Sequence, residues 1–194
     1  MSTETKTGRQ VNGVEAPSVG TWDLDPAHTS AAFVARHVLT KTRGRFNTIS
    51  GVVHIEENPL KSWVEVEIDA ASIETNHPDR DTHLKSADFL DVEQFPKLTF
   101  RSKEVRPKTA TEFELVGDLT IKDVTKEVVL EADFEGVSPD PFGTTTAAFT
   151  AKGEIDREEF GMTWNVAIET GGVLVGKKVQ LEIDAELHLR KDDA

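Results

Sequence analysis

One short segment of the 194-residue chain brings together side chains that could do acid–base chemistry. In Asp25-Pro26-Ala27-His28-Thr29-Ser30 a carboxylate, an imidazole and two hydroxyls follow one another closely, as they would in a hydrolase. An extended segment points alternate side chains to opposite faces, so these groups do not easily converge on one reacting atom. We therefore interpret the segment as a structural turn in which Asp25 and His28 bind backbone groups.

The other titratable residues give little support for a metal or a cofactor. None of the six histidines belongs to an HExxH motif or a close His-x-His pair. His77 and His83 flank Asp79 and Asp81 near the start of an expected helix, where the helix dipole alone explains acidic residues. Because the chain has no cysteine, disulfides, thiolate zinc sites and cysteine nucleophiles are excluded. We predict no catalytic residue, no metal and no cofactor.

The charge balance restricts the partners of the chain. With 22 Lys and Arg against 35 Asp and Glu, the net charge of −13 repels nucleic acid and anionic membrane surfaces. The basic run Lys41-Thr42-Arg43-Gly44-Arg45 is either a solvated hairpin end or a local cradle for an anionic head group. For the second case, Arg43 and Arg45 are the head-group candidates.

The first twenty residues are polar and rich in turn formers, and we expect residues 1–20 to be a flexible tail. They lack the apolar region of a secretory signal, and no stretch approaches the roughly 18 apolar residues of a membrane span. These features predict a cytoplasmic protein without stable membrane insertion.

The sequence pattern predicts one all-β domain over residues 21–190. Apolar and polar residues alternate along many segments, as at Val179, Leu181, Ile183, Ala185, Leu187 and Leu189. Such alternation predicts strands that are buried on one face, and about eight or nine of them would close the smallest barrel that holds a ligand. The segment 79–90 breaks the pattern and is predicted to be a short helix. The segment 156–174 is expected to be a loop.

The inward positions allow two interpretations. Apolar side chains that point into a barrel are ordinarily packed core, which would leave the barrel filled. Several inward residues are small, however, and would leave space if they cluster: Ala70, Gly117, Ala132, Ala151 and Gly153. His37 shares strand parity with Phe33, so it is either a hydrogen-bonded strut or a contact for the polar end of a ligand.

Four ordered blocks of the sequence resemble the YceI-like family, also called polyisoprenoid-binding or lipocalin-like. The blocks are 22–29 with Phe33, His37 and 44–46; 80–92 with 95–102; 117–126; and 155–162. The resemblance implies an extended eight-stranded antiparallel barrel with a helix beside it and a hydrophobic channel for an amphiphile. Family members are often periplasmic and often dimeric, which implies a homodimer here.

The alternation of inward and outward residues along the strands and the resemblance to the YceI-like family together predict a channel. This channel would bind, sequester or transport a polyprenyl chain, a prenylated quinone or a fatty amide. The predicted ligand contacts are Phe33, His37, Val53, Val66, Ile68, Leu98, Phe100, Leu119, Phe134, Phe149 and Leu181. We favour a neutral head group, bound by His37, over a diphosphate bound by Arg43 and Arg45. The alternatives are an enzyme that uses Asp25, His28 or His37 on such a lipid, and a filled barrel that serves stress-related protein interaction.

Overall fold

The computed structural model describes residues 8–139, 141, 143–169 and 171–191. Its strands are β1 (Gly8–Val11), β2 (Val14–Pro17), β3 (Gly20–Leu24), β4 (Ser30–His37), β5 (Thr40–Phe46), β6 (Ile49–Ile55), β7 (Trp63–Asp69), β8 (Ile73–Glu74), β9 (Lys97–Pro107), β10 (Glu112–Ile121), β11 (Val124–Pro139), β12 (Thr145–Asp156) and β13 (Val175–Leu189). Its helical segments are α1 (Pro78–Lys85) and three 3₁₀ turns, Pro59–Lys61, Ala70–Ser72 and Arg157–Phe160. The predicted all-β class is confirmed.

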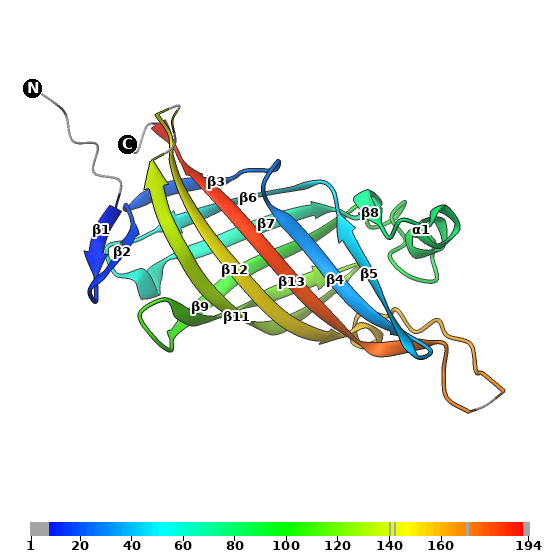
Figure 1. Cartoon of the computed structure of the whole chain (residues 1–194). Helices are drawn as coiled ribbons and strands as arrows, with labels where there is room; N and C mark the ends of the chain where they lie inside the picture. Colours follow the sequence, from blue (N-terminus) through cyan, green and yellow to red (C-terminus); the bar gives the residue numbers. More distant parts are fainter. Residues whose placement is uncertain (1–7, 140, 142, 170, 192–194) are drawn as a thin grey trace, which may run out of the picture.

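The strands form a closed barrel (Figure 1). β3 and β4 form one bent wall strand, because both pair with β13, and β5 and β6 form the next one, because β5 pairs with β4 and β6 pairs with β3. The ring continues through β7, β9, β10, β11 and β12, and the pairing of β12 with β13 closes it. Within the described residues the wall is therefore eight antiparallel strands, as predicted.

The barrel is long because its strands are long. β11 has 16 residues and β13 has 15. At about 3.3 Å per residue and a tilt of about 40°, a strand of 16 residues spans roughly 40 Å along the barrel axis. Figure 1 shows the strands running obliquely along the elongated barrel. A wall of this height encloses an interior long enough for an extended chain.

Two apolar clusters fill parts of the interior. One surrounds Trp22, whose side chain is fully buried and whose Nε1 donates to the carbonyl oxygen of Ser18 at 3.0 Å. The other lies at the α1 end, where Phe89, Phe160 and Met162 are buried together. Inward side chains elsewhere along the wall, such as Phe100 and Leu115, are only partly buried. The core is therefore not continuous.

The helix is shorter than predicted. α1 ends at Lys85, five residues before the predicted end of the segment 79–90. Both the backbone N–H and the hydroxyl of Ser86 donate to the carbonyl oxygen of His83, which ends the helix. Phe89 and Leu90 then continue as turns into the core. At the other end, Nδ1 of His77 accepts the backbone N–H of Arg80 at 3.3 Å, so His77 is a helix cap.

The predicted N-terminal tail is wrong for residues 8–17, which form the hairpin β1–β2 at one end of the barrel (Figure 1). Residues 1–7 lie outside the described part of the chain. Strands this short carry too few alternating residues for the pattern to reveal them. Among the described residues, no helix is long and apolar enough to cross a membrane.

Candidate ligand-binding cavity

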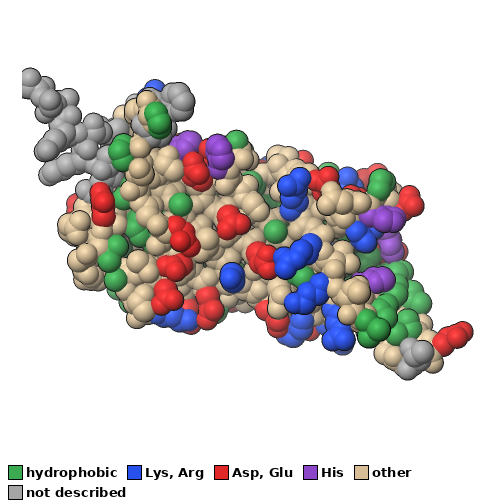
Figure 2. Space-filling model, in the orientation of Figure 1, with side chains coloured by type: hydrophobic (Ala, Val, Ile, Leu, Met, Phe, Trp, Pro, Cys, Tyr) green, Lys and Arg blue, Asp and Glu red, His purple; other side chains and the backbone are tan. Residues whose placement is uncertain are grey.

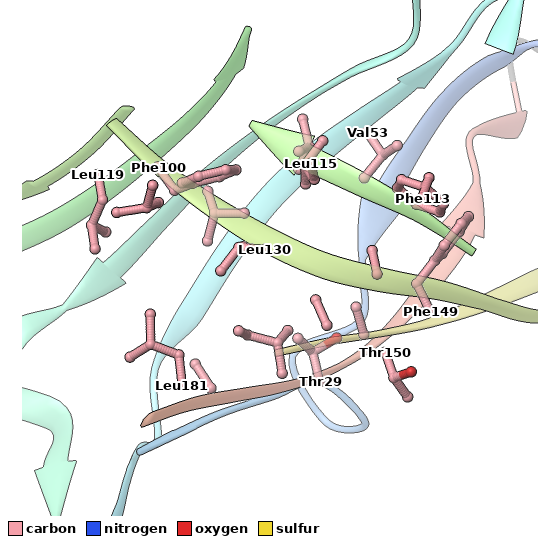
Figure 3. A pocket seen from close by; sticks show the side chains of 18 of the residues that line it. Thr29, Val53, Phe100, Phe113, Leu115, Leu119, Leu130, Phe149, Thr150 and Leu181 are labelled. Carbon is pink, nitrogen blue, oxygen red and sulfur yellow. The ribbon is translucent and has the colours of Figure 1, made fainter. Parts of the chain in front are cut away.

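A cavity of about 720 Å³ lies inside the barrel. Every strand of the wall contributes side chains to it, and the short strand β8 contributes Ile73 at the α1 end. Figure 3 shows Phe100, Leu119, Leu130 and Leu181 pointing toward the same open space. Ligand pockets usually measure about 300–1,000 Å³ and are mostly apolar, so this cavity has the size and the lining of a binding site.

All ten apolar residues that strand alternation and the family resemblance placed in the channel line the cavity. They are Phe33, Val53, Val66, Ile68, Leu98, Phe100, Leu119, Phe134, Phe149 and Leu181. Their contact with a ligand stays a prediction. The structure adds inward residues that the prediction did not name, among them Phe113, Leu115 and Leu130.

The small inward residues differ in whether they leave free space in the cavity. Ala132 and Ala151 pair across β11 and β12, and both line the cavity. Gly117 does not leave space, because a Cβ there would lie 2.5 Å from the Phe100 ring and 2.6 Å from the Arg101 carbonyl oxygen. At Gly153 the side chain of Leu130 would lie 2.6 Å away. The glycines thus let large neighbours pack closely, while the alanines leave room for a ligand.

Polar side chains gather where the cavity meets the hairpin β1–β2. We call this region the hairpin mouth, and its polar lining residues are Arg9, Asn12, Asn58, Ser62, Thr109, Thr111 and Glu112. The hairpin itself adds Val11, Val14, Ala16 and Pro17 to the lining. The hairpin mouth therefore combines the apolar side chains of the hairpin β1–β2 with amide and hydroxyl groups. These groups suit the polar head of an amphiphilic ligand.

Arg9 fastens the hairpin to the barrel. Its Nη1 donates to the carbonyl oxygen of Glu57 at 2.8 Å and to the Glu57 carboxylate at 3.2 Å, and its Nη2 donates to the carbonyl oxygen of Glu56. Its Nε is buried and has no partner among the described residues. Charge-assisted bonds at Arg9 thus tie the hairpin to residues 56 and 57 of the barrel.

At the opposite end the cavity meets a buried cation, Arg157, which is 3% exposed. Its guanidinium donates to the carbonyl oxygens of Met162, Trp164 (3.0 Å), Val175 (3.2 Å) and Gly176 (2.9 Å). Burial lowers the pKa of Arg157 below its usual value, although a guanidinium stays protonated in proteins. Backbone oxygens thus solvate the charge and tie the 3₁₀ turn to β13.

Three predicted head-group residues lie outside the cavity. His37 is exposed at the last residue of β4 and does not line the cavity. Arg43 and Arg45 point outward and form ion pairs with Glu182 (3.1 Å) and Glu74 (3.2 Å). On the face in Figure 2, Lys and Arg side chains lie among Asp and Glu in this way. Arg43 and Arg45 thus lie on the solvated outer surface, and their role as head-group ligands stays a prediction.

Asp25 and His28 also lie outside the cavity lining, at the bend between β3 and β4. Asp25 Oδ1 accepts the backbone N–H of Ala27 at 2.8 Å, as expected for the turn, but the His28 ring, which was expected to bind backbone as well, pairs with a carboxylate instead. Nδ1 of His28 lies 2.6 Å from Oδ2 of Asp25, and this contact lowers the pKa of Asp25 and raises the pKa of His28. Neither side chain reaches the interior.

Comparison with known proteins agrees with this geometry. The sequence profile of the YceI-like domain matches residues 22–187. The chain belongs to the YceI-like family. The UPF0312 protein SAB2563 of Staphylococcus aureus is 38% identical over 169 residues, which are 86% of this chain and 96% of that protein.

Solved structures share the YceI-like barrel. BcnA of Burkholderia cenocepacia has a TM-score of 0.72 at 21% identity, over 84% of this chain and 98% of that one. The YCEI protein of Campylobacter jejuni has a TM-score of 0.70 at 26% identity, over 80% and 90%. A polyisoprenoid binding domain of Saccharophagus degradans has a TM-score of 0.64 at 12% identity, over 87% and 98%. The first and third show the fold alone.

The sequence interpretation missed Arg157, Arg9 and the polar hairpin mouth. Arginine is usually exposed, so nothing in a segment interpreted as a loop marks Arg157 as buried. Arg9 lies in the stretch interpreted as a tail. One signal was present: the block 155–162 contains Arg157 within the family resemblance, away from any strand pattern.

Proposed function

We propose that this YceI-like protein binds, sequesters or transports a long apolar amphiphile of isoprenoid type inside its barrel. The observation that carries the proposal is the elongated apolar cavity of about 720 Å³, with polar groups gathered at one mouth. Burial contributes about 0.8 kcal/mol for each methylene group, less the cost of ordering the chain. A long flexible hydrocarbon therefore suits this wall better than a compact polar metabolite does.

The fold relationship supports the same class of ligand. The Saccharophagus degradans neighbour is described as a polyisoprenoid binding domain. A branched isoprenoid tail would pack against the aromatic side chains that line the cavity of this chain, among them Phe100, Phe134 and Phe149. Prenylated quinones and fatty amides offer a similar tail and belong to the same proposal.

The polar end of the ligand would lie at the hairpin mouth. Asn12, Asn58, Ser62 and Thr111 offer neutral donors and acceptors there. Arg9 is already paired with Glu57, and Glu112 adds a negative charge to the same lining. A diphosphate would meet little unpaired positive charge, whereas a hydroxyl, amide or quinone oxygen needs one or two hydrogen bonds. We therefore infer a neutral head group.

The two alternative functions find less support. A filled barrel would have its inward side chains packed together, but Phe33, Val66 and Leu119 border open space. The acid–base groups considered for an enzyme, Asp25, His28 and His37, do not line the cavity. A lipid held in the cavity would not reach them.

Equilibrium titration with fluorescent polyprenyl probes tests the proposal. A neutral polyprenol should bind, and the double variant Arg43→Ala/Arg45→Ala should bind it as the unchanged protein does. A polyprenyl diphosphate should bind no more tightly than the polyprenol, and its affinity should depend little on salt. Failure of both probes to bind would refute the lipid site. Tight, salt-sensitive binding of the diphosphate that the double variant loses would refute the neutral head.

A further inference from the structure

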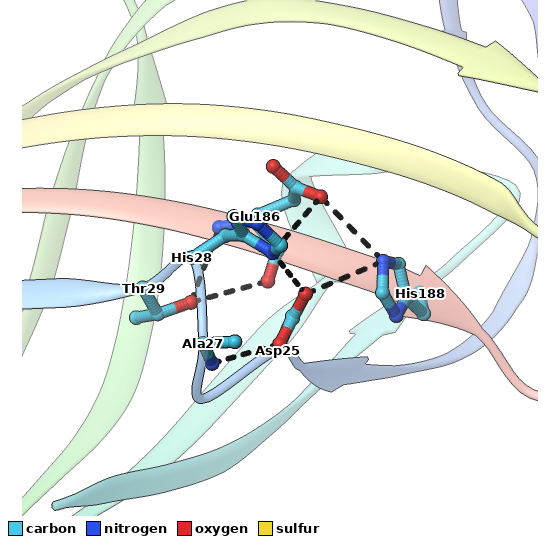
Figure 4. A network of polar contacts seen from close by, with 6 residues as sticks. All are labelled: Asp25, Ala27, His28, Thr29, Glu186 and His188. Carbon is cyan, nitrogen blue, oxygen red and sulfur yellow. Dashed lines mark hydrogen bonds and ion pairs between the residues drawn. The ribbon is translucent and has the colours of Figure 1, made fainter. Parts of the chain in front are cut away.

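Two imidazoles and two carboxylates converge on the outer surface of the barrel, away from the cavity (Figure 4). Asp25 and His28 come from the bend between β3 and β4, and Glu186 and His188 come from β13. Oδ2 of Asp25 lies 2.6 Å from Nδ1 of His28 and 3.7 Å from Nε2 of His188. Oε1 of Glu186 lies 3.9 Å and 3.6 Å from the same two nitrogens. Each carboxylate oxygen is thus flanked by both imidazoles.

The backbone holds these four side chains in place. The N–H of Asp25 donates to the carbonyl oxygen of Glu186 at 2.8 Å. The hydroxyl of Thr29 donates to that same oxygen and accepts the Glu186 N–H, both at 3.2 Å. Glu186 and His188 are two residues apart on one strand, so they project from the same face. The bend and β13 are therefore locked together directly beneath the cluster.

The donor set is that of a transition-metal site. Zn²⁺ binds imidazole nitrogens and carboxylate oxygens at about 2.0–2.2 Å in tetrahedral geometry, which places neighbouring ligand atoms about 3.3 Å apart. Three of the four nitrogen–oxygen separations, 3.6–3.9 Å, exceed that value slightly, and the 2.6 Å separation falls below it. A rotation of the His28 side chain that lengthens the 2.6 Å contact would bring the donor atoms of Asp25, His28 and Glu186 around one ion, with His188 next to them. The Asp25–His28 hydrogen bond would then be replaced by two metal–ligand bonds.

The chemistry of the ligands narrows the choice of ion. Ca²⁺ and Mg²⁺ prefer oxygen ligands alone, whereas two imidazoles favour Zn²⁺, Ni²⁺ or Cu²⁺. The side chains are also within reach of solvent, because that of His28 is 65% exposed and that of His188 is 37% exposed. Within the described part of the chain, Asp25, His28 and Glu186 have donor atoms that all lie within 4.8 Å of one another. His188 lies outside this group of three, with Nε2 3.7 Å from Asp25 and 3.6 Å from Glu186.

We propose that Asp25, His28, Glu186 and His188 bind one divalent transition-metal ion on the outer wall. The ion would join the β3–β4 bend to β13, at the point where β13 changes its partner from β4 to β3. It would link the bent strand formed by β3 and β4 to β13. This site is independent of the lipid cavity, so either can fail without the other.

Calorimetric titration of the chelator-treated full chain with Zn²⁺ alone tests the site. We expect one ion per chain, and a Kd at least ~10-fold weaker after Glu186→Gln or His188→Gln. The matched control is His54→Gln, because His54 is an outer-surface histidine 3.6 Å from a single carboxylate, Glu56. That control should bind Zn²⁺ as the unchanged protein does.

A spectroscopic measurement of the coordination geometry complements the affinity measurement. Co²⁺ in the same site should give the intense visible absorption of tetrahedral coordination, and the two ligand variants should lose it. If far-ultraviolet circular dichroism shows that either variant is unfolded, His28→Gln replaces it, since that side chain is mostly exposed. Absence of saturable Zn²⁺ binding to the unchanged protein overturns the proposal. Equal binding by the ligand variants and the control overturns it as well.

Discussion

Ala132 on β11 lies directly opposite Ala151 on β12, and both side chains face the cavity. This pair of methyl groups marks a place where the wall leaves room for a ligand. A large side chain at either position would enter the space that a lipid tail is proposed to occupy. Binding and stability should therefore respond differently to a substitution here.

We predict that Ala132→Trp weakens lipid binding and leaves the barrel folded. If the indole displaces three or four methylene groups, the loss is about 3 kcal/mol, or roughly 100-fold in Kd. Probe titration beside thermal unfolding measures both effects. The control is Ala147→Trp, because Ala147 is fully buried in the Trp22 cluster and does not line the cavity. Overpacking there should cost at least ~1–3 kcal/mol of stability. Equal destabilisation by both variants would favour a filled interior.

The hairpin β1–β2 is predicted to slow the release of ligand. Arg9→Ala removes the bonds to Glu56 and Glu57, and a loss of about 1.4 kcal/mol in lid closure would speed dissociation about tenfold. Stopped-flow dissociation of a fluorescent probe measures the rate. Arg101→Ala is the matched control, since Arg101 pairs with Glu65 on the outer wall. Identical dissociation rates in the two variants would contradict a lid function.

Arg157 is predicted to stabilise the fold. Arg157→Met removes the donor to the carbonyl oxygens of Met162, Trp164 and Gly176, and should cost at least ~2 kcal/mol in the free energy of unfolding. Chemical denaturation measures this loss. Arg106→Met, at an exposed arginine, should change stability by less than ~0.5 kcal/mol. A similar small effect at Arg157 would show that the buried guanidinium is not a structural tie.

Glu74 should contribute to the acid sensitivity of the fold. Hydrogen bonds from Asn47 and Arg45 hold the pKa of Glu74 below its usual value. Because the folded state favours the carboxylate, this stabilisation is present above the unfolded pKa of about 4.3 and is lost as the pH falls through the lower folded pKa. The stability advantage over Glu74→Gln should therefore shrink between about pH 7 and pH 3. An advantage that stays constant over this range would contradict the effect.

Much of the barrel could be predicted from the sequence because strand alternation maps directly onto inside and outside. This holds in the middle of strands, where Phe100, Leu119 and Leu181 face the cavity as expected. It fails at strand ends and turns, where His37 lies outside the cavity lining and α1 ends at Lys85. Contacts between distant segments, such as Arg9 with Glu57, leave no local pattern at all. The dimer and the cytoplasmic location stay predictions.

The presence of a lipid inside the barrel is tested most directly by mass spectrometry of the intact, folded protein after incubation with a bacterial membrane lipid extract. We predict a mass increase that corresponds to one long-chain amphiphile per chain, which organic solvent releases and which fragments as an isoprenoid, a prenylated quinone or a fatty amide. Ala132→Trp should lack this adduct, while Arg43→Ala/Arg45→Ala should keep it. An unchanged protein without any adduct, or an Ala132→Trp variant that retains the adduct in full, would contradict a lipid site in the cavity.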